Sequence, residues 1–90
     1  MEEYYLFTFD STHYAIHAQK LLKDLEPVIM PTLREISASC GISLKVQPNR
    51  IREACERMTE GVQGWHLYRI LKDGKKITCT ICKRSDTLTC

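Results

Sequence analysis

One cysteine near the middle of the chain lies among residues that can stabilise its thiolate. Cys40 is preceded by Arg34, Ser37 and Ser39 and followed by Gly41. The thiolate is the reactive form of cysteine, and cations or hydrogen-bond donors increase its fraction at neutral pH. The guanidinium and the two hydroxyls are such donors, so Cys40 is the leading candidate for a reactive thiol. The alternative, from the residues alone, is a small buried side chain, because free cysteine is often buried.

The other cysteines raise separate questions, since five thiols in 90 residues leave one unpaired if the rest form bridges. Cys55 falls on the apolar stripe of an expected helix and is interpreted as core packing. Cys79, Cys82 and Cys90 lie close to the C-terminus. Three interpretations of these secondary thiols stay open: a metal site needing a fourth ligand such as His66 or a second copy of the chain, a resolving or disulfide-forming thiol, and no special role. We expect no resident metal and no cofactor.

Histidines and basic residues supply weaker signals. His13 and His17 are four apart in an expected helix and could reach one metal ion, but no acidic or sulfur ligand is near them in sequence, which favours surface histidines. His13 is kept as a candidate proton donor or cation for Cys40. A small basic cluster favours solubility over RNA contact; it comprises Lys75, Lys76, Lys83 and Arg84.

Composition and charge bound the class of protein. A hydrophobic fraction of 43% with 27% charged residues is typical of a globular domain. A net charge of +2 is too weak to indicate a nucleic-acid partner without a localised patch. The N-terminus is acidic and no long apolar run follows, so we expect no signal peptide, no membrane segment and a cytoplasmic location.

Hydrophobic periodicity predicts the elements that must position Cys40. Alternating or continuous apolar runs predict strands, and apolar residues three and four apart predict helices. Asp73-Gly74 is a hairpin signal, and Thr32 with Glu35 forms a capping box for a short helical turn that Gly41 would stop. The strands are expected at 4–9, 28–30, 42–46, 65–71 and 76–81, and the two main helices at 10–26 and 48–61.

This order predicts an α+β fold, a ferredoxin-like split βαβ sandwich (βαββαβ) over residues 1–72. Residues 73–90 would add a C-terminal hairpin strand and a cysteine-rich tail, not a separate domain. In such a sandwich the connection that carries Cys40 lies at the end of the sheet where the first helix starts, near Asp10 to His13. The dipole of that helix favours a thiolate, whereas a short helix ending at Cys40 would oppose it.

At these residues the chain resembles a family of small bacterial proteins described as putative selenium/sulfur carrier protein-like. The resemblance rests on Tyr4 to His13, on Arg34 to Gly41 and on the strand from Trp65 to Leu71. It implies that Cys40 is the carrier thiol with Arg34, Ser37, Ser39 and Gly41 as motif neighbours, that a transient persulfide or selenopersulfide forms there, and that donor and acceptor proteins are the partners. Leu33 replaces the proline usual in such motifs, and the tail beyond Lys72 lies outside the resemblance.

The leading hypothesis is therefore a carrier of reactive sulfur or selenium, not a catalyst. One alternative is an interaction module for protein or RNA in which the cysteines are incidental. Another is a thiol-disulfide redox protein that pairs Cys40 with a tail cysteine. The sequence leaves open the choice between sulfur and selenium, the donor and acceptor, and a homodimer formed through an edge strand.

Overall fold

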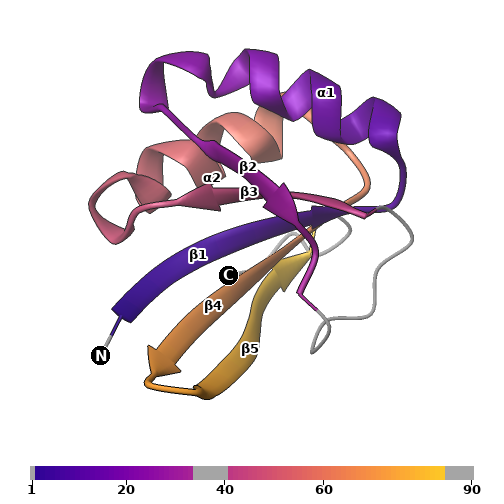
Figure 1. The fold of residues 1–90 in the computed structure, drawn as a ribbon. Coiled ribbons are helices and arrows are strands. Elements are labelled where there is room, and N and C mark those ends of the chain that lie inside the picture. Colours follow the sequence, from indigo (N-terminus) through magenta and orange to yellow (C-terminus); the bar gives the residue numbers. More distant parts are fainter. Residues whose placement is uncertain (1, 34–40, 85–90) are drawn as a thin grey trace.

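The protein is described by a computed structural model that covers residues 2–33 and 41–84 (Figure 1). These described residues form five strands and two α-helices, with two short 3₁₀ turns beside the helices. In chain order they are β1 (Glu2–Phe9), α1 (Thr12–Leu21), η1 (Lys23–Leu25), β2 (Val28–Pro31), β3 (Ile42–Val46), η2 (Pro48–Arg50), α2 (Ile51–Gly61), β4 (Trp65–Asp73) and β5 (Lys76–Arg84).

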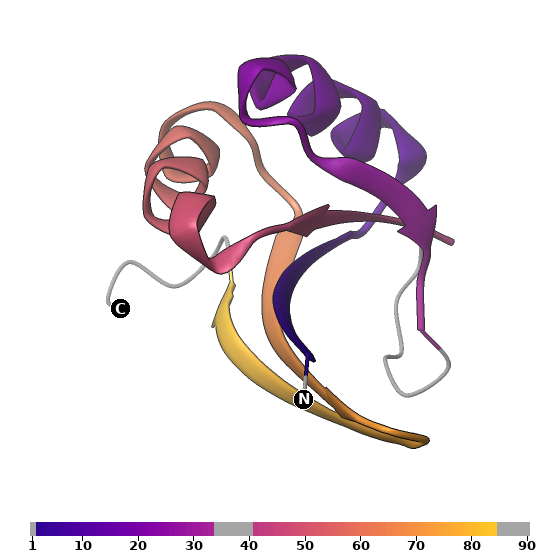
Figure 2. The ribbon, with the colours of Figure 1, turned by 60° about the vertical axis from the view of Figure 1, so that its left-hand side comes forward.

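The strands form one antiparallel sheet in the order β2-β3-β1-β4-β5. Both helices lie on one side of this sheet, as the views in Figures 1 and 2 show. The predicted α+β class is thus confirmed. The sheet has five strands where a ferredoxin-like sandwich has four, because β5 extends it beyond β4.

The main core lies between the sheet and the two helices. Trp65 is its largest side chain and is almost fully buried. Its ring meets Phe7 edge-on at 5.6 Å between centroids, and its indole N–H donates to the Val62 carbonyl at 3.0 Å. The small residues Ala15 and Ala18 turn towards this core from α1, and they let helix and sheet approach closely.

The first helix is shorter than the sequence predicted. It ends at Leu21, and the chain continues as η1 up to Glu26, which has a left-handed backbone with φ of 55°. Helical periodicity persists through this turn because Leu22 and Leu25 still point into the core, so spacing alone could not locate the break. The second helix behaves as predicted, with Pro48 at the start of the 3₁₀ turn that leads into α2.

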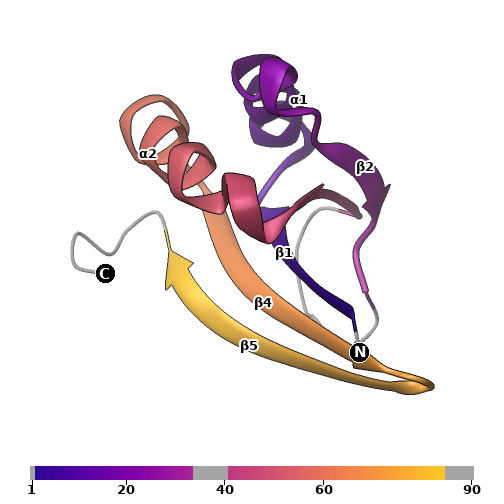
Figure 3. The same ribbon diagram turned by 90° about the vertical axis from the view of Figure 1, so that its left-hand side faces the viewer.

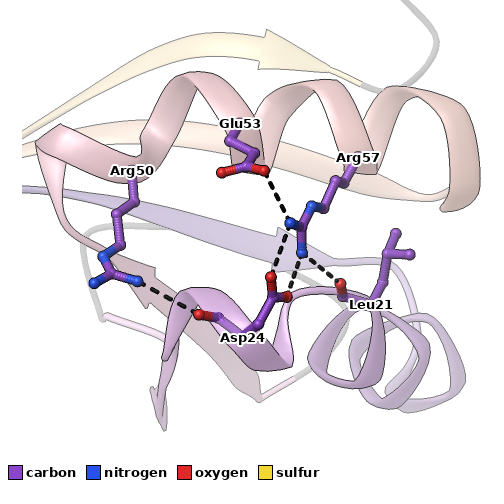
Figure 4. A network of polar contacts seen from close by, with 5 residues as sticks. All are labelled: Leu21, Asp24, Arg50, Glu53 and Arg57. Carbon is purple, nitrogen blue, oxygen red and sulfur yellow. Dashed lines mark hydrogen bonds and ion pairs between the residues drawn. The ribbon is translucent and has the colours of Figure 1, made fainter.

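A network of polar contacts centred on Arg57 joins the two helices (Figure 4). Its guanidinium donates hydrogen bonds to both carboxylate oxygens of Asp24, to the Glu53 carboxylate at 2.9 Å and to the Leu21 carbonyl at 3.3 Å. The hydrogen bond from Arg57 lowers the pKa of the Asp24 carboxyl, and the two carboxylates raise the pKa of the guanidinium. The network supplies a partner for the carbonyl of Leu21, the last residue of α1, where helix geometry leaves carbonyls without partners.

The hairpin signal at Asp73-Gly74 is confirmed, and β5 runs to Arg84, beyond the predicted end. Figure 3 shows β4 and β5 side by side as one long curved hairpin. The register shifts between Leu67 and Tyr68, where β5 carries one extra residue. A bulge of this kind increases the local twist and breaks the strict alternation that the sequence prediction assumed.

A second apolar cluster covers the sheet face opposite the helices, which we call the open face. Tyr4, Leu6 and Ile70 are buried there. Partly buried side chains pack around them: Met30, Leu33, Tyr68, Ile77 and Cys79. The strand β1 is therefore apolar on both faces. Within residues 2–33 and 41–84, no helix is long and apolar enough to cross a lipid bilayer.

Candidate functional site

The predicted carrier residues occupy the connection between β2 and β3. Arg34, Ser37, Ser39 and Cys40 lie outside the described residues, as does the capping-box turn. Leu33 precedes these residues and Gly41 follows them, and the structure describes both. They are the two flanks of the connection.

The two flanks are tied together. The Thr32 N–H donates to the Gly41 carbonyl at 3.1 Å, which adds one rung beyond the β2–β3 ladder. The Thr32 and Ser43 hydroxyls share a hydrogen bond of 2.8 Å. Leu33 packs on the cluster of the open face. The end of β2 and the start of β3 are thus held next to each other. Cys40 directly precedes Gly41 in the sequence.

These flanks lie at the end of the sheet where α1 begins. Since β3 is antiparallel to both β1 and β2, these two strands run in the same direction. Their last residues, Phe9 and Pro31, therefore lie at the same end of the sheet. Figure 1 shows β1 and β2 both running towards the end of the sheet where α1 begins. The expectation that the β2–β3 connection starts from the α1 end of the sheet is therefore confirmed for its described flanks.

His13, the candidate proton donor or cation for Cys40, lies at the start of α1, and its role towards Cys40 stays a prediction because Cys40 lies outside the described residues. The His13 side chain is exposed on the first turn of α1, with its ring 5.9 Å from that of Tyr14. Together with Ile16, His17 and Lys20 it lines an open surface depression. His66, at the start of β4, makes a polar contact with Asp10 at the same end of the sheet.

Asp10 and His66 form a pair that the sequence did not reveal. The Nε2 atom of His66 lies 3.0 Å from Oδ1 of Asp10, with side-chain exposures of 30% and 56%. The Asp10 N–H donates to the Gly64 carbonyl at 2.8 Å, which ties the end of β1 to the start of β4. A carboxylate only accepts hydrogen bonds, so Nε2 of His66 carries the hydrogen in this contact.

A row of polar side chains crosses the open face beside this pair. Thr8 opposes His66 in the β1–β4 register. On the other side of β1, one step beyond the Phe7–Leu44 pair, Thr8 comes next to Ser43. Thr8 and Ser43 are 1% and 0% exposed. Ser43 bonds to Thr32, whereas the Thr8 hydroxyl has no hydrogen-bond partner among the residues that the structure describes.

The described cysteines lie on α2 and β5. Cys55 is half-buried against the main core, as predicted. Cys79 is half-buried in the cluster of the open face, while Cys82 is exposed and contacts the Thr80 carbonyl at 3.6 Å. No disulfide joins these three cysteines, and the described part of the chain holds no group of three or more metal-capable side chains. Cys90 lies outside the described residues.

Comparison with known proteins gives one match. Searches of curated proteins and of solved structures find no significant similarity. The family described as "Putative Se/S carrier protein-like" matches residues 4–69, which include β1 to most of β4 and the whole β2–β3 connection, but not β5. The chain belongs to this Se/S carrier protein-like family.

Proposed function

We propose that the protein carries a reactive sulfur or selenium atom on Cys40 and passes it between partner proteins in the cytoplasm. The observation that supports this most is the family match, which spans the β2–β3 connection and therefore Cys40. We also propose that the fold is a ferredoxin-like sandwich enlarged by β5, because β3 lies between β1 and β2, and β1 lies between β3 and β4.

The position of the connection suits a carrier. Its flanks are held by the Thr32–Gly41 bond at one end of the sheet, so both ends of the connection are fixed to the fold. The start of α1 lies at the same end, and the free N–H groups of a helix start favour an anion. Its first turn contains no acidic residue to neutralise that field.

The transfer step needs no cofactor and balances without an oxidant. The Cys40 thiolate attacks the terminal sulfur of a donor persulfide, the donor's S–S bond breaks, and the donor leaves as a thiolate while Cys40 becomes a persulfide. The reverse type of step hands the atom to an acceptor thiol. Arg34 and the seryl hydroxyls are proposed to hold the persulfide anion by charge-assisted hydrogen bonds.

Loading by a cysteine desulfurase tests the proposal. The wild-type protein is incubated with the desulfurase and free cysteine, and its intact mass is measured after alkylation. We expect one added sulfur atom, lost in Cys40→Ser and retained in Cys55→Ser, which alters a half-buried helix thiol instead. Equal loading of Cys40→Ser and wild type would contradict the assignment of Cys40, and no loading of wild type alongside a working positive control would contradict the carrier function.

A second candidate, thiol-disulfide chemistry with Cys79, has one supporting observation. Leu33, the residue before the Cys40 segment, and Cys79 pack on the same cluster of the open face. A Cys40 persulfide attacked at its inner sulfur by the Cys79 thiol would give a Cys40–Cys79 disulfide and release hydrogen sulfide. Non-reducing peptide mapping after loading distinguishes the two: this disulfide, absent from Cys79→Ser, supports the redox function, and a stable persulfide supports the carrier.

A further inference from the structure

The two outer edges of the sheet differ in how well they are protected against pairing with another strand. Among the described residues, β2 and β5 are the outermost strands. An edge strand presents main-chain donors and acceptors, and proteins block such edges with short strands, prolines, charges or bulges. β2 has four residues and ends in Pro31. β5 has nine residues, contains no proline, and holds a run of uncharged residues at 77–82.

Proline closes the β2 edge to pairing. The Thr32 N–H donates to the Gly41 carbonyl, in line with the β2–β3 ladder. Successive residues of a strand direct their main-chain groups to alternate sides, so the nitrogen of Pro31 and the N–H of Ile29 face away from β3. Proline has no N–H to donate. Within β2, an outward main-chain donor is therefore left at Ile29 alone.

The β5 edge presents a longer row of outward main-chain groups. The two-residue turn at 74–75 makes Asp73 and Lys76 a hydrogen-bonded pair. By the same alternation, the N–H and carbonyl groups of Ile77 and Ile81 face away from β4. The register with β4 is regular up to Ile81, and the bulge follows it. This part of β5 is therefore straight enough to pair with a further strand.

The side chains along this edge also suit a strand partner. Ile81 is 42% exposed, and it lies opposite Tyr68, which packs on the apolar cluster of the open face. Thr78 and Thr80 are exposed, and β-branched side chains favour paired strands. A strand added to β5 would cover Ile81 and extend the cluster.

The charge of this region selects the kind of strand. Residues 70–84 contain one acidic residue, Asp73, and these basic residues: Lys72, Lys75, Lys76, Lys83 and Arg84. The first three are exposed and form no ion pair with another described residue. A second copy paired antiparallel about Cys79 would place Lys75 opposite Lys83 twice, and like charges directly opposite are destabilising. A strand with acidic ends meets these lysines favourably instead.

We propose that the outer edge of β5 binds an extended segment of a partner protein by strand addition, and that this segment carries acidic residues on both sides of an uncharged, β-branched middle. The main-chain groups of Ile77 and Ile81 supply the hydrogen bonds, and the lysines at the turn supply the preference for acidic ends. β5 lies outside the matched residues 4–69. The inference does not depend on the carrier function.

A synthetic peptide, Glu-Glu-Ile-Thr-Val-Thr-Ile-Glu-Glu, is the probe, and its binding is followed by fluorescence anisotropy. The control peptide has the same sequence N-methylated throughout its middle, which keeps the charges but prevents pairing. We expect saturable binding of the first peptide alone. Amide hydrogen exchange by NMR should slow at Ile77 and Ile81 by about tenfold or more on binding, with Ile29 unchanged. Equal binding of both peptides would show charge attraction without strand pairing and would overturn the proposal, as would no binding.

Two protein variants test the edge and the charge separately. Ile81→Pro removes an outward N–H and leaves the ladder with β4 intact, so binding should weaken by about fivefold or more. Ile29→Pro makes the same change at the β2 edge and should leave binding unchanged. Replacing Lys75 and Lys76 together by glutamine should weaken binding by about threefold or more at low salt.

The urea midpoint of each variant checks its folding, and the glutamine variant decides if Ile81→Pro does not fold. Unchanged binding in the folded variants would overturn the proposal. Slow exchange at Ile77 and Ile81 in the free protein would also overturn it, because the edge would already be covered. Sedimentation then identifies the cover: protection that rises with a dimer indicates a second copy, and protection in a monomer indicates the chain itself.

Discussion

Two glycines with the same backbone conformation allow the packing at the α1 end of the sheet to be measured. Gly64 and Gly74 have φ of +68° and +60°. A Cβ at Gly64 would lie 2.6 Å from two ring atoms of Tyr14, whereas a Cβ at Gly74 would meet nothing within 4 Å. The Gly64 carbonyl also accepts a hydrogen bond from the Asp10 N–H. Gly64→Ala therefore perturbs the support of the Asp10–His66 pair, and Gly74→Ala is its matched control.

The expected magnitudes follow from these contacts. A left-handed conformation costs alanine about 1 to 2 kcal/mol, of which about 0.4 to 1 kcal/mol is offset because alanine restricts the unfolded chain. Gly74→Ala should thus lower the free energy of unfolding by about 0 to 1.6 kcal/mol. Gly64→Ala carries the same backbone term and must also displace the half-buried Tyr14 ring, which adds about 1 to 3 kcal/mol.

Urea unfolding followed by the fluorescence of Trp65, the single tryptophan, measures both variants. We expect the difference between them to equal the added steric term, about 1 to 3 kcal/mol. If the two variants lose the same stability to within about 0.5 kcal/mol, the described packing of the Tyr14 ring against Gly64 is wrong.

Three further predictions concern the rest of the fold. Because Arg57 lowers the pKa of Asp24 below its usual 3.8, the ionised pair stabilises the fold above that pH. This stabilisation is lost as the pH falls through the pKa of Asp24 in the folded state. The difference in urea midpoint between wild type and Asp24→Asn should therefore narrow below about pH 4. Trp65→Phe should lower the free energy of unfolding by about 2 to 3 kcal/mol, measured by circular dichroism, since it leaves a cavity and an unpaired carbonyl; a change under about 0.5 kcal/mol would contradict the buried indole bond. Exposed Cys82 should alkylate faster than half-buried Cys55 in the native protein, with equal rates in urea as the control; native rates that are already equal would contradict their described burial.

The sequence predicted the elements better than their ends or contacts. Strand alternation and the Asp73-Gly74 turn located the sheet and its hairpin, because these signals are local. The early end of α1 at Leu21 could not be predicted, since Leu22 and Leu25 keep helical spacing while the backbone changes to a 3₁₀ turn. The bulge in β5 likewise depends on its pairing with β4.

The sequence predicted only the part of the candidate site whose reactive residues lie close together in the chain. Cys40 and its donors lie within seven residues of one another. Asp10 and His66 are 56 residues apart and meet only because β1 and β4 are adjacent. Thr8 looks like an ordinary strand residue in sequence, and its burial without a partner appears only in three dimensions. No spacing rule could have found this row.

We propose Cys40 as the thiol that carries the transferred atom. The most direct measurement is peptide mapping of all five cysteines by mass spectrometry, after the folded wild-type protein is loaded by a persulfide donor and its persulfides are trapped by alkylation. We expect the added sulfur on the peptide that contains Cys40, with Cys55, Cys79 and Cys82 unmodified. An unmodified Cys40 peptide, or sulfur spread equally over the thiols, would contradict it.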